Sequence, residues 1–580
     1  MQLETISHKV QFCVIGGGLA GMCAAIAAAR HGIKTLIMQE RPMFGGNASS
    51  EVRMWICGAD NCLETGIIEE LRLENLYRNP NSNYSVWDSI LFEKVRFQDN
   101  LISLLNTSCL SAETEDDRIT SVTGYQQTTQ CYHKVEADYF ADCSGDSILA
   151  LLAGADFRIG REDKSEFGET LAQNVSDKKT MGLSCILQAR EYATKQHFTP
   201  PEWANKYPDD DSFPARCHVL NNSQNFWWLE LGGNQNSIAD TETLRDELLK
   251  DAYGIWDHIK NHGDHGADNW ALDWVGILPG KRESRRCIGD YILNEKDVLS
   301  GGKFDDTVAY GGWPIDDHNP DGFRHYGRAN LIIKPEQPYG IPLRSLYSRN
   351  ISNLLFAGRN ISATHTALSS TRVMATCALI GQAMGTAASI CINENVTPHG
   401  VYETKIKTLQ NKLRDAGCYI PGTVREIPEL TKSAKINLPE SELTLLQNGI
   451  ERPDENMTVN YATLNIGDSL EFDFGETKEL SELRLVFDPD FSRKSITSNK
   501  KMRVFAQKLM TGKDFEPVKV ANTLVKSFRV LADGKEIFAD TNNRNSLRKI
   551  ALGVKAQKLT VIFDETRGID KVHLFSADVK

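Results

Sequence analysis

Three consecutive stretches near the start of the chain differ sharply in hydrophobic pattern. Residues 10–16 are mostly apolar and short, residues 19–31 are rich in alanine, and residues 34–39 are again apolar. Two short apolar runs around an alanine-rich segment of helical length predict strand, helix and strand, that is, a βαβ unit. We therefore expect an α/β domain with a parallel sheet to begin here.

Strand and helix signals of the same kind return much later in the chain. A strand is predicted near 353–358, and an alanine-rich buried helix follows it. We expect residues 1–155 and 271–425 to form one discontinuous α/β domain. The stretch 156–270, rich in tryptophan, asparagine and aspartate, is then an inserted α+β region that covers the substrate.

The last part of the chain has a different period. Apolar residues recur at every second position in 470–474, 483–487 and 559–563, and the turn signal Asp533-Gly534 lies among them. Alternation of this kind is typical of half-buried strands. We expect an antiparallel β-sandwich over residues 435–580.

Length, charge and cysteine content narrow the class of protein. A chain of 580 residues implies about two to four domains. The net charge of −12 argues against nucleic-acid binding, which depends on neutralising phosphates. The 13 cysteines lack zinc-type spacing, so we expect no metal site and a reducing, cytoplasmic compartment. We also expect no membrane span, because glycines interrupt the apolar run 12–29. The sequence is compatible with a leader that has been removed. It is also compatible with a homo-oligomer.

The first predicted turn carries the sequence Gly16-Gly17-Gly18-Leu19-Ala20-Gly21. In this GxGxxG pattern the first glycine allows a tight turn, the second lets a pyrophosphate approach the backbone, and the third permits close helix–strand packing. The helix start adds amide donors and a positive dipole. Glu40, at the end of the second strand, would accept hydrogen bonds from a ribose. These features in register predict a dinucleotide site.

Three further segments place glycine-rich turns beside predicted strands: Glu40–Ser49, Ala141–Asp146 and Asn353–Arg359. They resemble three segments of flavoproteins of the glutathione-reductase type. Glu40–Ser49 resembles the segment whose pair of glycines lies near the pyrophosphate, and Ala141–Asp146 resembles the Ala-Thr-Gly turn. Asn353–Arg359 resembles the late strand beside the flavin-side phosphate. The resemblance implies a Rossmann-like FAD/NAD(P)-binding domain with FAD as its cofactor.

The resemblance is closer to the FAD-dependent oxidoreductase subgroup, related to fumarate reductase, over roughly residues 10–420. Its marks are Leu278–Arg286, Tyr310–Pro314, Tyr339–Pro342 and Gly358–His365. No histidine stands beside Gly45-Gly46, so the FAD is expected to be non-covalent. Pattern and resemblance together predict these cofactor-binding residues: Gly16, Gly18, Leu19, Ala20, Gly21, Glu40, Arg41, Gly45, Gly46, Asn47, Ala48, Ser49, Cys109, Ser144, Gly145, Gly358 and Arg359.

Four residues are candidates for the chemistry. His365 lies in a loop that is expected to pass the flavin, and a histidine there could act as the base that takes a proton from an alcohol. The alternative is that His365 only holds the loop in place. His318 is a candidate proton carrier or substrate contact. Arg372 would stabilise a developing negative charge or pair with a carboxylate. Arg285 lies in the charged run Arg282–Arg286, which is an active-site candidate by resemblance and otherwise a solvated face.

The C-terminal strand pattern, with Lys501–Phe505 and the closing strands 559–563 and 572–575, resembles a galactose-binding-like β-sandwich. That resemblance implies either a glycan ligand at the loops of one end or a packing surface. Tryptophans of the 156–270 region would stack on sugar rings, although tryptophan more often lies in cores or interfaces.

We therefore expect an FAD-dependent oxidoreductase that transfers a hydride between FAD and a CH–OH carbon of a small polar molecule such as a sugar or polyol. Three alternatives remain: a C=C reductase of the fumarate-reductase kind, a glycan-binding or assembly protein with structural FAD, and an RNA-modifying flavoenzyme, which the charge disfavours.

Overall fold

The computed structural model describes residues 3–59, 64–222, 224–452, 459–490, 510–514, 517 and 519–580. The chain forms two compact units. The first comprises Met1–Asp60, Asn81–Gln410 and Phe505–Pro517, and the second Asn61–Pro80, Asn411–Val504 and Val518–Lys580. Residues 61–80 thus group with the C-terminal strands, and the region 156–270 groups with the nucleotide-binding residues. The three predicted domain ranges stay a prediction.

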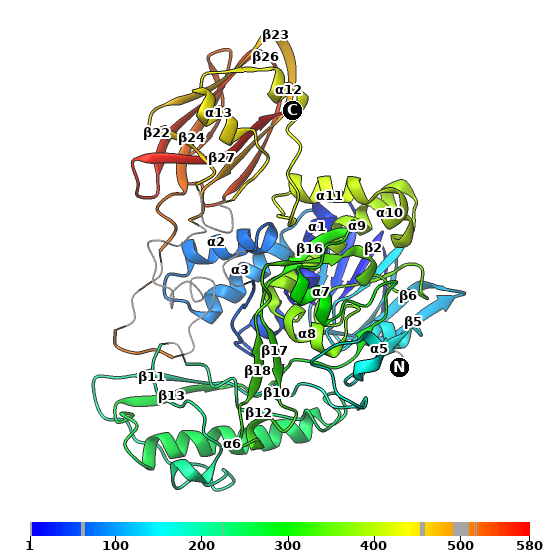
Figure 1. The fold of residues 1–580 in the computed structure, drawn as a ribbon, viewed down its shortest axis with the longest axis vertical. Helices are drawn as coiled ribbons and strands as arrows, with labels where there is room; N and C mark the ends of the chain where they lie inside the picture. Colours follow the sequence, from blue (N-terminus) through cyan, green and yellow to red (C-terminus); the bar gives the residue numbers. More distant parts are fainter. Residues whose placement is uncertain are drawn as a thin grey trace. The chain divides into compact units, whose positions relative to one another are not determined.

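A parallel sheet lies at the centre of the first unit (Figure 1). Its strands are buried at almost every position, as expected when helices cover both faces. The strand order is β20 (Leu354–Phe356), β8 (Tyr139–Asp142), β2 (Phe12–Ile15), β3 (Thr35–Met38) and β4 (Leu101–Leu104). Strand β2 pairs in parallel with β3 on one side and with β8 on the other, so the predicted βαβ unit is confirmed.

Two alanine-rich helices, α1 (Leu19–Arg30) and α9 (Met374–Glu394), pack against each other in this unit. Two glycines of α9 make the approach possible. A Cβ atom added to Gly381 would lie 2.0 Å from the Ala20 carbonyl oxygen, and one added to Gly385 would lie 2.1 Å from the Ala24 carbonyl oxygen. Small residues on both helices therefore bring the two backbones into direct contact.

Helix α9 is the one helix among the described residues that is long and apolar enough to cross a membrane. Of its most apolar 18-residue window, 94% is buried within the protein. Burial of this degree is that of a core helix.

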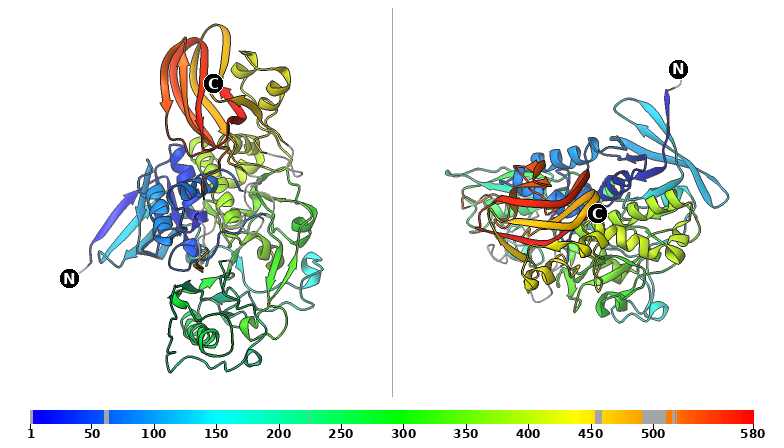
Figure 2. Two further views of the ribbon diagram at one scale, coloured as in Figure 1. Left: turned by 90° about the vertical axis from the view of Figure 1, so that its left-hand side faces the viewer. Right: turned by 90° about the horizontal axis from the view of Figure 1, so that it is seen from above.

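A second, antiparallel-rich sheet flanks the central one, with the order β1 (Thr5–Lys9), β7 (Cys131–Glu136), β6 (Arg118–Gln126), β5 (Thr107–Glu115). In Figure 2 this sheet, in blue and cyan, projects from the rest of its unit, with the N-terminus at the end of β1. Its inner residues, Val122 and Val135 among them, share one apolar cluster with Phe140 and Phe356 of the central sheet.

The region 156–270 is built around helix α6 (Thr241–Asn261), which Figure 1 shows beside strands β11 (Leu187–Glu191) and β13 (Trp270–Val275). Trp228, Trp256 and Trp270 are buried in its apolar cluster. Three of the five tryptophans are therefore core residues, which agrees with the structural alternative to sugar stacking. The same cluster holds Phe213, Leu248, Ile255 and Phe323.

The second unit is an antiparallel sheet in which hydrogen bonds join all seven strands. The predicted alternation is confirmed at most positions, since Leu470, Phe472 and the inward residues of 483–487 and 559–563 are buried in one cluster. The predicted turn is also confirmed: Asp533 and Gly534 have φ of 46° and 80°, the pair of positive values of a type I′ hairpin. The strands are β21 (Lys435–Ile436), β22 (Ala462–Asn465), β23 (Ser469–Phe487), β24 (Val525–Ala532), β25 (Lys535–Asp540), β26 (Leu547–Thr566) and β27 (Lys571–Val579).

The described strands form one continuous sheet, and the two-layered galactose-binding-like sandwich stays a prediction. Lys501–Phe505, on which the resemblance partly relied, lies outside the described residues. The long strands β23 and β26 change register between Asp473 and Lys478. Because of this irregularity β23 is not a uniform ladder along its length.

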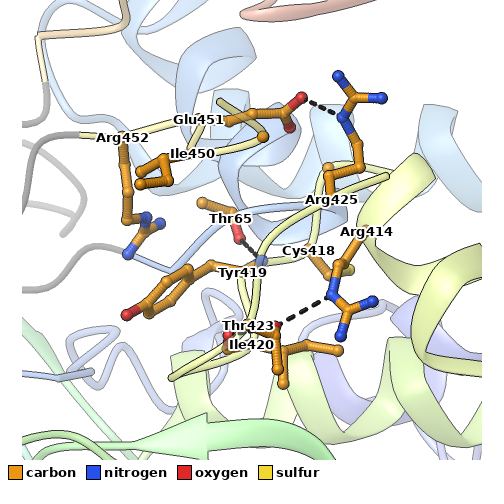
Figure 3. Close-up of a pocket in the computed structure, with 12 residues that line it drawn as sticks. Thr65, Arg414, Cys418, Tyr419, Ile420, Thr423, Arg425, Ile450, Glu451 and Arg452 are labelled. Atoms are coloured by element: carbon orange, nitrogen blue, oxygen red, sulfur yellow. Dashed lines mark hydrogen bonds and ion pairs between the residues drawn. The ribbon is translucent and has the colours of Figure 1, made fainter. Parts of the chain in front are cut away.

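A small cavity of about 40 Å³ lies in the second unit, at the segments that precede its strands (Figure 3). The Thr65 hydroxyl accepts a hydrogen bond from the Tyr419 amide (2.9 Å), and Arg425 donates to Glu451 (2.7 Å). The volume has room for about three water molecules, which is well below that of a sugar ring. This cavity is therefore a hydrated gap between charged side chains.

Candidate functional site

The glycines of the first turn serve different purposes. Gly16 has φ of +104°, and a Cβ there would lie 2.4 Å from the Cys143 carbonyl oxygen. A Cβ on Gly21 would lie 1.9 Å from the Gly16 carbonyl oxygen. At Gly18 the nearest atom to an added Cβ is 3.9 Å away, on Gly46. Gly16 and Gly21 are thus required by packing, whereas Gly18 leaves open space where helix α1 begins.

The Gly45-Gly46 turn lies directly beside this loop. The Gly45 amide donates to the Gly17 carbonyl oxygen (2.8 Å), and a Cβ added to Gly46 would lie 3.1 Å from the Gly18 Cα atom. The following residues are held by Ser49, whose hydroxyl donates to the Gly46 carbonyl oxygen (2.8 Å), and by Asn47, whose amide donates to the Lys281 carbonyl oxygen (3.1 Å). Two turns, 27 residues apart along the chain, therefore lie with their backbones in direct contact.

The ribose side of the site lies at the end of strand β3. The Glu40 side chain is 62% exposed, and its neighbour Gln39 accepts a hydrogen bond from the Gly17 amide (2.7 Å). The Arg41 Nη1 atom is buried 3.8 Å from Glu51 without a hydrogen bond. Cys109 lies on β5, two residues after Thr107, whose amide donates to Gln39. An accessible carboxylate and an unsatisfied guanidinium beside the glycine loop suit an incoming nucleotide.

The turns after β8 and β20 meet at Asp146. Its carboxylate accepts hydrogen bonds from Arg359 (2.6 Å), Lys281 (2.7 Å) and the Ser284 hydroxyl (2.7 Å). Burial opposes ionisation, but the Arg359 and Lys281 cations hold the pKa of Asp146 far below its usual range. The Arg359 guanidinium also lies over Gly145, at 3.0 Å from an added Cβ. Arg359 thus positions the Gly145 and Gly358 turns.

Strand β17 (Ile315–His318) separates two networks of charged residues, because alternate residues of a strand point to opposite faces. On one face Asp317 accepts from His365 Nε2 (3.0 Å), and Glu283 lies 2.9 Å from His365 Nδ1. Burial opposes protonation, but these two carboxylates raise the pKa of His365 to about 10.

This environment argues against His365 as the catalytic base. Both ring nitrogens lie within hydrogen-bond distance of a carboxylate oxygen, at 2.9 Å and 3.0 Å, which leaves neither of them for a substrate hydroxyl. The His365 amide also donates to Glu162 (2.8 Å), and His365 is the first residue of helix α8 (His365–Thr371). The alternative reading, in which His365 holds this loop in place, is therefore the one that the geometry favours.

The other face of β17 carries His318 and Asp316. His318 Nδ1 lies 2.6 Å from Glu230, and its Nε2 lies at a long 3.4 Å from Asp316. Arg282 lies 3.4 Å from Glu230, and Arg372 lies 3.4 Å from Asp316. The Arg372 Nε atom is buried without a hydrogen bond. A histidine, two carboxylates and two guanidinium groups thus converge from four separate segments, with His318 and Asp316 both on β17.

Three of the four predicted catalytic residues belong to these two networks, and Arg285 does not. The Arg285 guanidinium donates to the Asp146 carbonyl oxygen (3.0 Å) and lies 5.5 Å from the Phe157 ring. Its neighbour Arg282 points to the His318 cluster instead. Sequence reasoning missed Glu230 and Asp146, because nothing near Glu230 in the sequence marks it as the partner of a histidine 88 residues later.

The fold and the site define a class of protein. A Rossmann-like parallel sheet brings the glycine turns together at the start of helix α1, and the residues there fit an FAD molecule: open space at Gly18, a carboxylate at Glu40, and the Gly45-Gly46 and Gly145 turns alongside. The sequence matches the family described as FAD dependent oxidoreductase over residues 11–413. The chain belongs to this family, and it is an FAD-dependent oxidoreductase.

Solved structures with similar folds include p-nitrophenol 4-monooxygenase from Pseudomonas putida, with 10% identity, 72% of this chain and 91% of that chain covered, and a TM-score of 0.31. A flavin-dependent brominase has 10% identity, with 70% of this chain and 85% of that chain covered, and a TM-score of 0.32.

Glycerol-3-phosphate dehydrogenase from Bacillus halodurans, a structure complexed with FAD, has 14% identity over 33% of this chain and a TM-score of 0.20; the match spans 43% of that chain. None of the curated proteins matches the sequence. At such scores these neighbours carry no argument about substrate.

Proposed function

We propose that this FAD-dependent oxidoreductase transfers a hydride between FAD and a CH–OH carbon of a small, polar, uncharged molecule, with His318 as the residue that takes the hydroxyl proton. The observation that supports this is the His318–Glu230 pair at 2.6 Å. A carboxylate on Nδ1 sets the ring orientation and leaves Nε2 facing away from it.

The proton and the hydride leave the substrate separately. The hydroxyl proton passes to His318 Nε2, whose contact with Asp316 is too long to compete strongly with a substrate. FAD held at the Gly16–Gly21 and Gly45-Gly46 turns would supply the acceptor for the hydride of the same carbon, so that the alcohol would become a carbonyl. Glu230 stabilises the imidazolium that forms, as expected of a carboxylate fixed on the other nitrogen.

The charges of the cluster favour an uncharged substrate. The two guanidinium groups, Arg282 and Arg372, each lie within ion-pair distance of a carboxylate, Glu230 and Asp316 respectively. Binding a dicarboxylate of the fumarate kind would compete with these pairs, of which Arg282–Glu230 is buried and Arg372–Asp316 is partly buried, and it would add negative charge beside two carboxylates. A sugar or polyol would instead use the same groups as hydrogen-bond partners. The C=C reductase is therefore the second alternative.

The test is anaerobic reduction of the FAD-loaded enzyme by a panel of sugars and polyols, followed as loss of the oxidised-flavin absorbance. For a substrate that reduces the wild type, His318→Gln should slow reduction by about 10²-fold or more, because a general base contributes at least that much. His365→Gln is the matched control and should keep the rate per bound FAD within a few-fold.

Two results would contradict the proposal. Wild-type reduction rates in His318→Gln would exclude His318 as the base. Failure of every alcohol, together with reoxidation of dye-reduced enzyme by an unsaturated carboxylate, would support the C=C reductase. If neither substrate class reacts while FAD stays tightly bound, the glycan-binding or assembly role with structural FAD is favoured.

We also propose a galactose-binding-like fold for residues 435–580 and a cytoplasmic location. The first is supported by the alternating strands of the second unit. The second is supported by the cysteines, since all those described are free thiols, as is typical of reducing compartments. A glycan-array measurement on the full chain tests for a sugar ligand, and cell fractionation tests the location.

A further inference from the structure

Four metal-ligating side chains from the region 156–270 converge at one end of helix α6. They are Asp210, His218, His258 and His265, and one ligand atom from each lies within 4.8 Å of all the others. Asp210 is in the short 3-10 helix Asp210–Ser212, His258 is in the last turn of α6, and the two other histidines are in the connections that follow these elements. None of the four belongs to the networks on strand β17.

In His258 and His218, Nδ1 is bonded to a backbone carbonyl oxygen and Nε2 faces the Asp210 carboxylate. His258 Nδ1 donates to the Tyr207 carbonyl oxygen (2.9 Å), and His218 Nδ1 donates to the Arg216 carbonyl oxygen (2.7 Å). Because a carbonyl oxygen only accepts, the proton of each ring is on Nδ1, and Nε2 keeps its lone pair. The Nε2 atoms lie 3.0 Å and 3.4 Å from Asp210 Oδ1.

The third histidine is anchored through its other nitrogen. His265 Nε2, which lies 4.0 Å from Asp210 Oδ1, donates to the His262 carbonyl oxygen (3.0 Å), so Nδ1 is the nitrogen of this ring that is left to bind a metal. A backbone carbonyl on the second nitrogen is the usual outer partner of a metal-binding histidine, since it sets the tautomer and the ring orientation. All three imidazoles of the cluster have such a partner.

We propose that Asp210, His218, His258 and His265 bind a zinc ion with tetrahedral geometry. Zinc–nitrogen bonds of about 2.0–2.1 Å place the ligand atoms of a tetrahedron about 3.3 Å apart. The distances from Asp210 to His258 and His218 already match, and closing the widest separation requires a movement of about 1.5 Å. His218 and His265 allow this movement, because both lie in connections and not in a helix or strand.

The donor set and the surroundings favour zinc in a structural role. Three imidazoles and one carboxylate suit zinc better than magnesium or calcium, which prefer oxygen ligands. Four protein ligands leave no open position for a substrate. The Phe213 ring, 5.0 Å from the His258 ring, shields the buried side of the cluster. The ion would tie the connection 208–222 to the end of α6, across about 40 residues of sequence.

No metal was expected, because the cysteines lack zinc-type spacing, and the spacing of these four residues does not reveal the site either. His258 and His265 are seven positions apart, and His218 precedes them by 40 and 47 positions. Only the folding of 208–222 against α6 brings them together. The inference is independent of the proposed substrate.

The test measures zinc in the full-length chain, produced without a histidine tag and loaded with FAD. We expect about one zinc per chain by elemental analysis, removal by a strong chelator with a loss of several degrees in Tm, and recovery of both on adding zinc. Cobalt in place of zinc should show the strong visible absorption of a tetrahedral site.

Variants separate a built site from incidental binding. Asp210→Asn and His218→Ala should lose most of the zinc while keeping their FAD. His262→Ala is the matched control, since His262 is at the same end of α6 and offers only its carbonyl oxygen, and it should keep the zinc. A wild-type chain that is free of metal and unchanged in Tm by added zinc would overturn the proposal. So would full zinc content in both ligand variants.

Discussion

The contact between helices α1 and α9 allows the FAD site to be perturbed without touching a residue that lines it. In Gly381→Ala, the new Cβ would lie 2.0 Å from the Ala20 carbonyl oxygen. Ordinary contact requires more than 3.0 Å, so the two backbones must separate by about 1 Å. Ala20 is in the first turn of α1, where FAD phosphates would be held, so the displacement reaches the cofactor.

The magnitude follows from two opposing terms. Overpacking a core by one methyl group costs about 1–3 kcal/mol and more when the clash is with backbone. Replacing glycine by alanine inside a helix returns about 1 kcal/mol. We expect a net loss of about 2 kcal/mol in stability and, because the first turn of α1 moves, an FAD affinity weaker by roughly tenfold, which corresponds to 1.4 kcal/mol.

The assay combines thermal unfolding with titration of FAD into apoprotein, followed by flavin fluorescence. Gly385→Ala clashes equally, at 2.1 Å, but with Ala24 one turn further from the glycine loop, so it should lose similar stability with less effect on FAD affinity. Gly400→Ala, where an added Cβ meets only ordinary contacts at 3.4 Å, should change neither quantity by more than a small amount. Wild-type FAD affinity and Tm in Gly381→Ala would refute the reasoning.

Three further outcomes are expected. The pKa of His365 is raised from 6.5 to about 10, so its ion pairs stabilise the fold fully below pH 6.5 and progressively less as the pH rises toward 10. The Tm of the wild type should therefore fall across this pH range. His365→Gln removes the titrating group and should flatten the dependence of Tm on pH. Asp146→Asn leaves Arg359 and Lys281 without their carboxylate, which should cost about 1–3 kcal/mol and release FAD more readily in a flavin-retention assay; an unchanged Tm would contradict this. Gly534→Ala places a Cβ at φ of 80° and should cost about 1 kcal/mol by chemical denaturation, with no change in FAD content.

Local pattern was sufficient for the elements of the nucleotide-binding half. The predicted helix at 19–31 is α1 (Leu19–Arg30), and the predicted strands around it are β2 and β3 within two residues at each end. An alanine-rich helix between two short apolar strands has few ways to bury its surface, so these segments carry their structure in their composition. The glycine turn and the carboxylate stand at fixed distances along the chain and predict a dinucleotide site, and the resemblance of further segments to flavoproteins implies that the dinucleotide is FAD.

Unlike the helices and strands, the roles of the charged residues and histidines could not be predicted from local pattern, because each role depends on the partner that the fold places beside the side chain. His365 is a candidate base in the sequence, and the fold places it between two carboxylates, 82 and 48 positions away, that raise its pKa. His318 acquires its carboxylate from Glu230, and the proposed zinc site joins four positions with no common period. Ionisation and coordination are set by distances of a few ångströms between remote segments, and only the tertiary structure decides those distances. The sequence by itself determined the dinucleotide site and the core elements, because both rest on local spacing, and it left the chemistry of the site to the packing of the whole chain.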